Sequence, residues 1–362
     1  MELYDIRRGE KQIVVLLDDK MRIIKPVFDY MKFLMLKDRS ENTIKAYGLD
    51  LKIYWQFLEI RRYDYKEVSV NTIGEFKEYL MSGTYDENIT YYNDISKRTG
   101  KTINRILNTI YNFYKYCAMV LDIDNPILME TINRPFDMFK GLLYHTRPNN
   151  KTNRSIFKVK ESSRQIKLIT QEDAHMFLES LSTLRDKLIF KILYLSGARI
   201  GEVLELKIED IPCPESSKQI AVLRNIKSKG KRRDLYIPMS LLEELDNFIM
   251  EERNYIDTEH SYIFVSKQPQ QLGKHLTYRG IYEVFNNVKR KTNIIFNFHD
   301  LRHTHITALI ESGMDISVVK IIAGHKHIQT TQNYTHLSNK YIESSLNRYW
   351  AKSSLIGIEE NV

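Results

Sequence analysis

The chain has 362 residues, with 54 lysines and arginines against 46 aspartates and glutamates, so its formal net charge at pH 7 is +8. Its 43% hydrophobic and 28% charged residues are typical of globular proteins and exclude a disordered polymer. The apolar runs are too short for a membrane span, and the first residues do not have the pattern of a secretory signal. Two widely separated cysteines, Cys117 and Cys213, exclude a disulfide framework and a cysteine zinc site, which predicts a protein of the reducing cytoplasm.

Most of the positive charge lies in one short segment, residues 147–167. Its only acid is Glu161, and its cations are Arg147, Lys151, Arg154, Lys158, Lys160, Arg164 and Lys167, so the segment carries +6 of the total +8. The two longer parts on either side are close to neutral. The segment has two interpretations: a solvated linker between domains, or a strap that lies along phosphates.

The part before this segment reads as helical. Apolar residues recur every three or four positions over residues 44–58, 73–80 and 103–120, and Ser40 is a candidate N-cap. Upstream, Ile13–Leu17 and Met21–Ile24 flank an Asp-Asp-Lys turn and predict a small hairpin. We therefore predict an N-terminal extension over residues 1–24, a helical domain over 25–146, a basic linker over 147–167 and a second domain over 168–362.

The second domain opens at Thr170, a candidate N-cap, and a helical pattern breaks at Ser196-Gly197. Strands are expected at Gln219–Ile226 and Asp234–Pro238, around a basic turn at Lys229-Gly230, and at Tyr262–Ser266. The pattern is then helical to about residue 350. A mainly helical domain holding a small antiparallel sheet follows from this order of elements.

Two short motifs of the second domain are rich in arginine and lysine. In Gly197-Ala-Arg199-Ile-Gly-Glu202, the break between helices leaves Arg199 at a helix start, where an arginine beside N–H groups makes an anion site. A plain surface pair with Glu202 explains the same residues. The turn over Lys227–Arg233 has enough cations to touch a scissile phosphate, although such turns also serve only solubility.

Two further motifs carry histidine and tyrosine. His299-Asp-Leu-Arg302-His303-Thr-His305 suggests a zinc site, but no Glu follows the first His and an arginine is a poor neighbour for a dication, so no metal is expected. In the last motif a helix ends at Gly324, His325 follows, and Thr330 or Thr331 can cap a helix that bears Tyr334. Taken alone, this tyrosine reads as a packed aromatic.

In this order and spacing the four motifs resemble the tyrosine recombinase family, the phage-integrase-type enzymes of DNA strand exchange. Gly-x-Arg-x-x-Glu, a basic hairpin, His-x-x-Arg and Gly-His with Tyr nine residues later occur in turn. The segments Asn42–Tyr47 and Ile103–Leu107 are similar to the helical core-binding domain of that family. The resemblance implies a mainly α fold: a helical core-binding domain and a mixed α/β catalytic domain, mostly helical with a small antiparallel sheet.

The resemblance also implies a mechanism in which a tyrosine forms a 3′-phosphotyrosyl bond with DNA, without metal, ATP or other cofactor. The catalytic candidates are Arg199, Lys229, His299, Arg302, His325 and Tyr334. Two guanidinium groups suit the dianionic transition state, and a histidine with an ordinary pKa suits removal of the tyrosine proton, here assigned to His299. By resemblance, Lys229 protonates the leaving 5′-oxygen and His325 contacts a nonbridging oxygen. Ala323, where the family has a bulky apolar residue, and a longer hairpin depart from the pattern.

The expected partner is double-stranded DNA, bound by a homo-oligomer that forms a tetramer in the synaptic complex, with accessory proteins of the mobile element and no membrane. Candidate DNA-binding residues are Lys45, Arg105, Arg147, Lys151, Arg154, Lys158, Lys160, Arg164, Lys231 and Arg232. The segment Leu337–Trp350 is expected to form an amphipathic helix that docks on a neighbouring protomer. A bacterial, nucleoid-associated integrase or transposase is the leading hypothesis.

Two other functions stay open at this point. A non-catalytic DNA-binding accessory relative would not need all six catalytic candidates, and a chromosome dimer-resolving recombinase would not need residues 1–24 or so long a linker. Residues 1–24 themselves have two interpretations, an arm that binds DNA or a cap on the core-binding domain.

Overall fold

The computed structural model describes residues 1–8, 11–82, 98–133, 151–161, 167–215, 217–228, 231–332 and 334. The chain divides into two compact units, Met1–Arg164 and Gln165–Val362. The division falls inside the basic segment over 147–167. The expected tail helix over Leu337–Trp350 lies outside the described residues.

The first unit opens with an antiparallel hairpin of β1 (Glu2–Arg8) and β2 (Lys11–Leu17). The prediction paired β2 with Met21–Ile24, and this is wrong: that segment contributes one isolated bridge, between Leu17 and Ile23. Val14 and Leu16 are buried in the core of the unit, and Leu3 and Val14 border Gly48 of the helix α2 (Glu41–Arg61). The hairpin is thus packed on the helical domain by the inward face of β2, as a cap would be.

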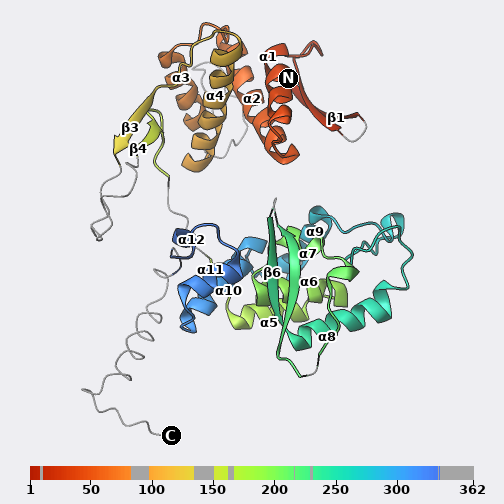
Figure 1. Cartoon of the computed structure of the whole chain (residues 1–362). Helices are drawn as coiled ribbons and strands as arrows, with labels where there is room; N and C mark the ends of the chain where they lie inside the picture. The colour runs from red at the N-terminus through yellow and green to blue at the C-terminus, as the bar shows by residue number, and fades with distance from the viewer. Residues whose placement is uncertain are drawn as a thin grey trace, which may run out of the picture. The chain divides into compact units, whose positions relative to one another are not determined.

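Helices make up the rest of the core of this unit (Figure 1). Besides α2, they are α1 (Lys25–Leu36), α3 (Val70–Ser82) and α4 (Gly100–Val120). The prediction of helices over 44–58, 73–80 and 103–120 is confirmed, and so is the cap, because the Ser40 side chain accepts a hydrogen bond from the backbone of Thr43. Aromatic side chains fill the space between the helices; Tyr54 and Tyr114 are completely buried and share a hydrogen bond of 2.8 Å.

Part of the basic segment is folded onto the first unit. An antiparallel pair of β3 (Met129–Asn133) and β4 (Lys151–Ser155), which the sequence analysis did not predict, brings the chain back to the helices. Asn104 of α4 then bonds both backbone groups of Val159, accepting from its N–H at 2.8 Å and donating to its carbonyl at 2.9 Å. Phe157 and Val159 pack against the core. Residues 151–161 are therefore an ordered part of the first unit.

The second unit is built around α6 (Leu184–Ser196), which contacts α10, α8, α7, α5 and the hairpin strand β6. The other helices are α5 (Gln171–Glu179), α7 (Ile200–Leu204), α8 (Met239–Phe248), α9 (Tyr278–Thr292), α10 (Phe298–Glu311), α11 (Ile316–Ala323) and α12 (Ile328–Gln332). Short 3-10 helices span Ile208–Asp210 and Pro269–Gln271, and a π-helical turn spans Ile249–Arg253. Thr170 caps α5 as predicted.

The second unit has one long hairpin, of β5 (Ile220–Ser228) and β6 (Lys231–Pro238), as expected from the sequence. Residues 262–266 were expected to form a strand, but they form only isolated bridges, from Tyr262 to Lys207 and from Val265 to His275. Backbone hydrogen bonds hold the segment on both sides, from Ile263 to Leu206 and from Leu276 to Phe264, but the pairing does not extend into a ladder. The fold class is confirmed: a helical unit and a mostly helical α/β unit.

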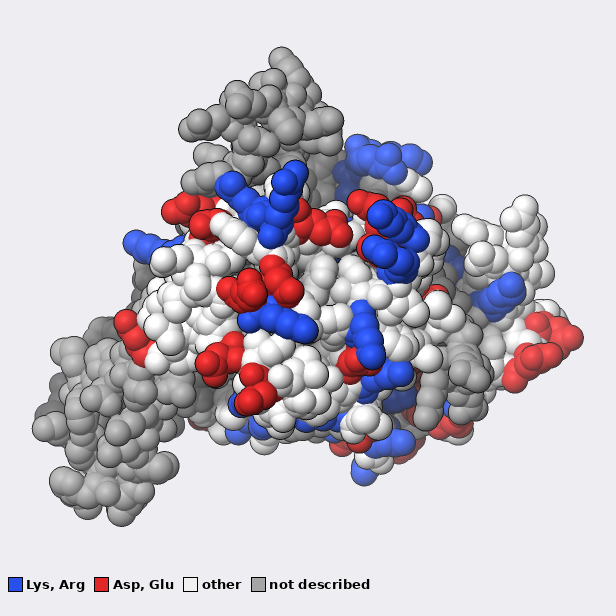
Figure 2. Space-filling model, turned by 90° about the horizontal axis from the view of Figure 1, so that it is seen from above, with Lys and Arg blue, Asp and Glu red and all other residues white. Residues whose placement is uncertain are grey.

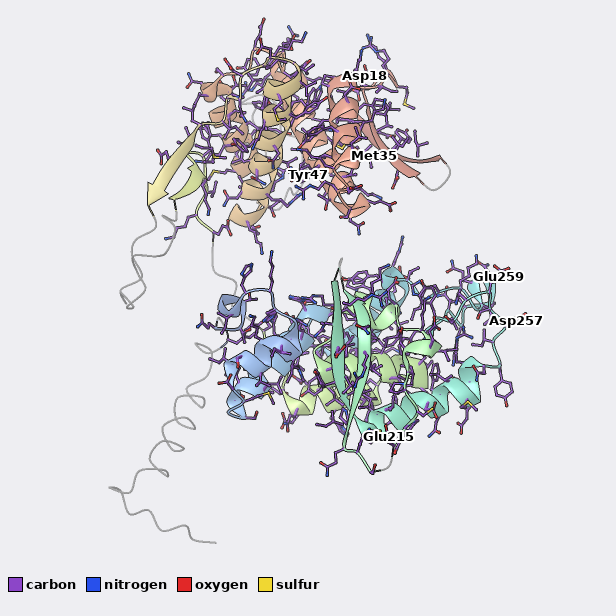
Figure 3. The ribbon with its side chains drawn as sticks, in the orientation of Figure 1. Asp18, Met35, Tyr47, Glu215, Asp257 and Glu259 are labelled. Carbon is purple, nitrogen blue, oxygen red and sulfur yellow. The ribbon has the colours of Figure 1, made fainter. Side chains whose placement is uncertain are left out.

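Acidic side chains lie at separate places on the second unit. Figure 3 shows Glu215 at the end of the β5–β6 hairpin where β5 begins and β6 ends, and Asp257 and Glu259 on the side of the unit far from α10 and α11. On the face of the molecule shown in Figure 2, acidic and basic side chains are interspersed. None of the helices in the described part of the chain has the length and apolar character needed to cross a bilayer.

Candidate active site

One buried carboxylate holds two arginines. Arg199 is the N-cap of α7; its backbone N–H and its Nη1 each donate to Glu202, at 2.8 Å. Arg233 of β6 donates its Nη2 to the same carboxylate at 2.6 Å, and its Nε at 3.2 Å. Glu202 is 2% exposed. The predicted surface pair of Arg199 with Glu202 is therefore present, but it belongs to a cluster of three charges in which Glu202 and Arg233 are buried and Arg199 is partly exposed.

Arg302 connects the two loops that carry Arg199 and His325. This side chain of α10 is 2% exposed, donates Nη1 to the carbonyl of Gly197 at 2.7 Å, and donates Nη2 to the carbonyl of Ala323. Gly197 ends α6 just before Arg199, and Ala323 ends α11 just before Gly324 and His325. Burial, reinforced by the charges of Arg199 and Arg233, lowers the pKa of Arg302 to about 10. The guanidinium stays charged at neutral pH.

The loop after α11 places His325 beside this cluster. Gly324 ends the helix in the left-handed region, at φ 62°, and Arg233 donates to the neighbouring carbonyl of Ile322 at 2.7 Å. The Nδ1 of His325 lies 2.9 Å from the hydroxyl of Thr331. Burial, and then the charges of Arg302 and the other arginines, lower the pKa of His325 to about 4. Its ring is therefore neutral at neutral pH.

Tyr334 follows α12 in a turn and is 5% exposed. The prediction of a helix capped by Thr330 or Thr331 and bearing Tyr334 is wrong, because both threonines lie inside α12, which ends at Gln332. The ring of Tyr334 is stacked at 6.3 Å from that of His325. Its hydroxyl is hydrogen-bonded to Nδ1 of His303 at 2.6 Å, and burial raises the pKa of the phenol.

Helix α10 carries two further histidines, one of which contacts His303. His299 is exposed in the first turn of the helix, with its ring centroid 4.8 Å from that of His303. His305 lies against Gly197, and burial lowers its pKa to about 4. Among the described residues, no three His, Cys, Asp or Glu side chains are grouped as ligands of a metal ion. Lys229 lies outside the described residues; its neighbours in the chain on either side of this gap, Ser228 and Lys231, are paired.

The candidate DNA-binding residues are scattered over both units. Lys45 pairs with Asp5 at 3.3 Å, and Arg105 pairs with the buried Asp50 at 2.6 Å while its side chain stays half exposed. The others lie as follows: Lys158, Lys160 and Arg232 are exposed, Lys151 and Arg154 lie on β4, Lys231 begins β6, and Arg147 and Arg164 lie outside the described residues.

Sequence reasoning missed the parts played by Arg233 and His303. Successive side chains of a strand point to opposite faces, and Arg233 is on the same face of β6 as the buried Leu235 and Ile237, whereas Arg232 is exposed. This alternation is the one signal in the sequence that could have indicated an inward-facing Arg233. His303 was considered only as a zinc ligand. No signal in the sequence pairs it with Tyr334, 31 residues away.

A model described as the phage integrase family matches residues 164–340, a range that contains all four motifs and every described residue of the second unit. Over this range the chain matches the phage integrase family. Transposase A from transposon Tn554 of Staphylococcus aureus is 29% identical over 344 residues, which cover 93% of this chain and 94% of the transposase. Tyrosine recombinase XerC of Staphylococcus haemolyticus is 27% identical over 318 residues, covering 84% and 89%.

Solved structures of this family have the same fold. The XerH site-specific recombinase in its post-cleavage complex matches with a TM-score of 0.60 and 18% identity, covering 86% of this chain and 81% of that one. The Tn1549 transposon integrase with circular intermediate DNA matches with a TM-score of 0.58 and 15% identity, covering 90% and 99%. The family match and the two relatives, rather than the structures, support an enzyme of DNA strand breakage and rejoining of the tyrosine recombinase kind.

Proposed function

We propose that this tyrosine recombinase integrates or excises a mobile element by joining Tyr334 to the 3′ phosphate of a cut DNA strand. One observation carries the assignment of the site. Arg302 bonds the two loops that present Arg199 and His325, and the Tyr334 ring lies against that of His325. Groups far apart in the sequence thus come together around one position suited to a phosphate.

The charge of the cluster fits the reaction. Arg199, Arg233 and Arg302 contribute three positive charges and Glu202 one negative charge, so the cluster carries +2. A phosphodiester carries one negative charge in the ground state and two on its nonbridging oxygens in the pentacoordinate transition state, so the attraction grows as the reaction proceeds. Loss of one such donor typically lowers the rate by about 10²–10³. We assign that stabilising role to Arg199 and Arg302.

We assign His325 as a hydrogen-bond donor to a nonbridging oxygen. When the Thr331 hydroxyl donates to Nδ1, the neutral ring carries its proton on Nε2, and this N–H is the group offered to the phosphate. Lys229, in the hairpin turn, is proposed to protonate the leaving 5′-oxygen. Because the phosphotyrosyl bond conserves the energy of the broken bond, no nucleotide cofactor is needed for rejoining.

The relatives support DNA as the substrate and a mobile element as the context. Transposase A from Tn554 matches nearly the whole chain, more than XerC does, which favours a transposase or integrase over a chromosome dimer-resolving enzyme. The structural neighbours include recombinases bound to their DNA sites, one of them a dimer. We propose that this chain also acts as a multimer on duplex DNA, with a tetramer in the complete complex and accessory proteins that set direction.

Trapping the covalent complex tests the proposal. A suicide substrate, nicked near the cleavage position so that the freed fragment diffuses away, should accumulate a protein–DNA adduct that survives denaturation. Tyr334→Phe should abolish this adduct, whereas Tyr255→Phe, at a tyrosine that is 81% exposed, should not. If the wild-type protein binds its element-end DNA but yields no adduct, the chain is a non-catalytic accessory relative.

The salt dependence of binding tests the basic segment. Each phosphate contact contributes about 0.9 to the log–log slope of affinity against salt. The double variant Lys158→Gln/Lys160→Gln should therefore lower the slope by about 2 if both lysines meet phosphates. The matched variant Lys37→Gln/Lys66→Gln removes the same charge from exposed positions elsewhere on the first unit. Equal slopes of affinity against salt for the two variants would show that residues 151–161 connect the two units without contacting DNA phosphates.

A further inference from the structure

The Tyr334 hydroxyl has a histidine at hydrogen-bond distance. Its oxygen lies 2.6 Å from Nδ1 of His303, within the range for a strong O–H···N hydrogen bond. The ring of Tyr334 packs among Ile306, Ile310 and Val319, so the phenol is fixed by apolar contacts on one side and by His303 on the other. A phenol in such a place must lose its proton to a neighbouring group before it can attack phosphorus.

We propose that His303 is the catalytic residue that takes the proton of Tyr334 during strand cleavage and returns it during rejoining. The inference rests on the proposed function and names one further residue of that reaction. In the reactive tautomer, Nε2 carries the hydrogen and the Nδ1 lone pair accepts from the phenol O–H. Geometry within hydrogen-bond reach of the transferred proton is the first requirement for a general base, and His303 meets it.

The step balances without another reactant. As the Tyr334 oxygen forms its bond to phosphorus, its proton passes to Nδ1 of His303, which becomes an imidazolium ion. The bond between phosphorus and the 5′-oxygen breaks, and this oxygen takes a proton from the general acid, assigned above to Lys229. In rejoining, the oxygen of a 5′-hydroxyl attacks phosphorus and gives its proton to the deprotonated group assigned above to Lys229. The bond between phosphorus and the Tyr334 oxygen breaks, and the imidazolium of His303 protonates the departing phenolate.

The fold explains why a base at this place would be well positioned. His303 directly follows Arg302, so one helix fixes the buried guanidinium and the partner of the nucleophile. The start of that helix is held by Asn297 and Asp300: Asn297 accepts from the His299 backbone at 2.9 Å, and its own N–H donates to Asp300 at 2.9 Å. His299 stands one turn earlier in contact with the His303 ring, at the exposed end, and is the competing candidate for the same proton.

The first experiment measures single-turnover cleavage of the suicide substrate by His303→Asn. Asparagine keeps a polar atom near the position of Nδ1 but cannot take up a proton at neutral pH. We expect cleavage to slow by about 10²–10⁴-fold, the usual contribution of general acid–base catalysis. His175→Asn, at an exposed histidine of α5, is the matched control and should cleave at the wild-type rate. Thermal unfolding and DNA affinity are measured for each variant; if His303→Asn unfolds early, His303→Gln takes its place.

The second experiment separates proton removal from a structural role. A fluorinated tyrosine at position 334 gives a more acidic phenol, which needs less help from a base. It should accelerate His303→Asn by a larger factor than it changes the wild-type rate. The same fluorinated tyrosine is also tested in His299→Asn. The more acidic phenol should restore the cleavage rate most in the variant that lacks the proton acceptor, so the comparison identifies which histidine takes the proton.

The outcomes of the two proposals are distinct. No adduct from the wild-type protein on DNA that it binds would refute the proposed function, and with it this inference. The inference alone would be refuted if the wild-type protein forms the adduct, Tyr334→Phe does not, and His303→Asn cleaves as fast as the wild-type protein. Compensation by the fluorinated tyrosine in His299→Asn and not in His303→Asn would refute it too.

Discussion

Replacing Arg233 should destabilise the second unit far more than replacing its neighbour Arg232. Arg233 has a side chain that is 9% exposed and bonds both Glu202 and the carbonyl of Ile322. Breaking a buried ion pair by removing one partner costs about 3–5 kcal/mol, because the remaining charge loses its compensation. Arg199 still pairs with Glu202, so we expect Arg233→Leu to cost about 3 kcal/mol, the lower end of that range. Arg233→Lys keeps the charge but not the several hydrogen bonds, so it should cost less.

The assay is urea unfolding of the full chain, combined with amide hydrogen exchange to locate the change. Faster exchange is expected in α7 and around Ile322, the two places that Arg233 bonds. Arg232→Leu is the matched control: its side chain is exposed and makes one long contact, 3.4 Å, to the carbonyl of Asn225, so its cost should stay within about 0.5 kcal/mol. Equal stabilities of Arg233→Leu and Arg232→Leu would refute the view that the ion cluster stabilises the fold.

Three further predictions concern stability. The pKa of His305 is about 4 in the folded chain and about 6.5 when unfolded, so the unfolded state binds more protons between these values. When the pH is lowered from 7.5 to 5, His305 alone should contribute up to about 2 kcal/mol to the loss of stability, measured as the difference between wild type and His305→Gln in urea unfolding at both pH values. Asn104→Ala removes both bonds to the Val159 backbone and should speed amide exchange over residues 157–161, at a local cost of about 1–3 kcal/mol. Gly324→Ala combines a positive φ with a new Cβ 2.6 Å from the Arg233 side chain and should lower Tm by several degrees, measured by calorimetry.

Each of these three predictions has its own control. His305→Gln should remove its part of the pH dependence, and an unchanged slope would assign that dependence to other groups. Asn108→Ala, at an exposed position of α4, should leave exchange over residues 157–161 unaltered. Gly201→Ala adds a Cβ with no atom within 4 Å and should be nearly neutral, so a loss of Tm equal to that of Gly324→Ala would contradict the steric argument.

The sequence predicts those features whose causes are local. The helices α2 and α4 are long, strongly periodic and capped by Ser40 and Thr99, so their positions follow from spacing and capping alone. The same holds for the ends of α6 and α11, where Gly197 and Gly324 take the left-handed conformation that glycine favours. The places of Arg199 and His325, directly after these two ends, could therefore be predicted.

Features that depend on distant packing could not be predicted. Residues 151–161 read as a linker because lysines and arginines dominate them, while Phe157, Val159 and the distant Asn104 hold them to the helices. The placement of Tyr334 in a turn, and its bond to His303, arise only when α10, α11 and α12 pack together. Hydrophobic periodicity tells which face of each helix is buried, but not which polar side chains meet there.

The two cysteines differ in a way that makes the chain convenient for fluorescence work. Cys117 is fully buried in α4, and burial raises the pKa of its thiol to about 12, so its thiolate is scarce at neutral pH. Cys213 is exposed, between the 3-10 helix at Ile208–Asp210 and β5. A maleimide dye should therefore attach once per native chain without any engineered residue. Counting bleaching steps of such single dyes on immobilised DNA would give the number of protomers in each assembled complex.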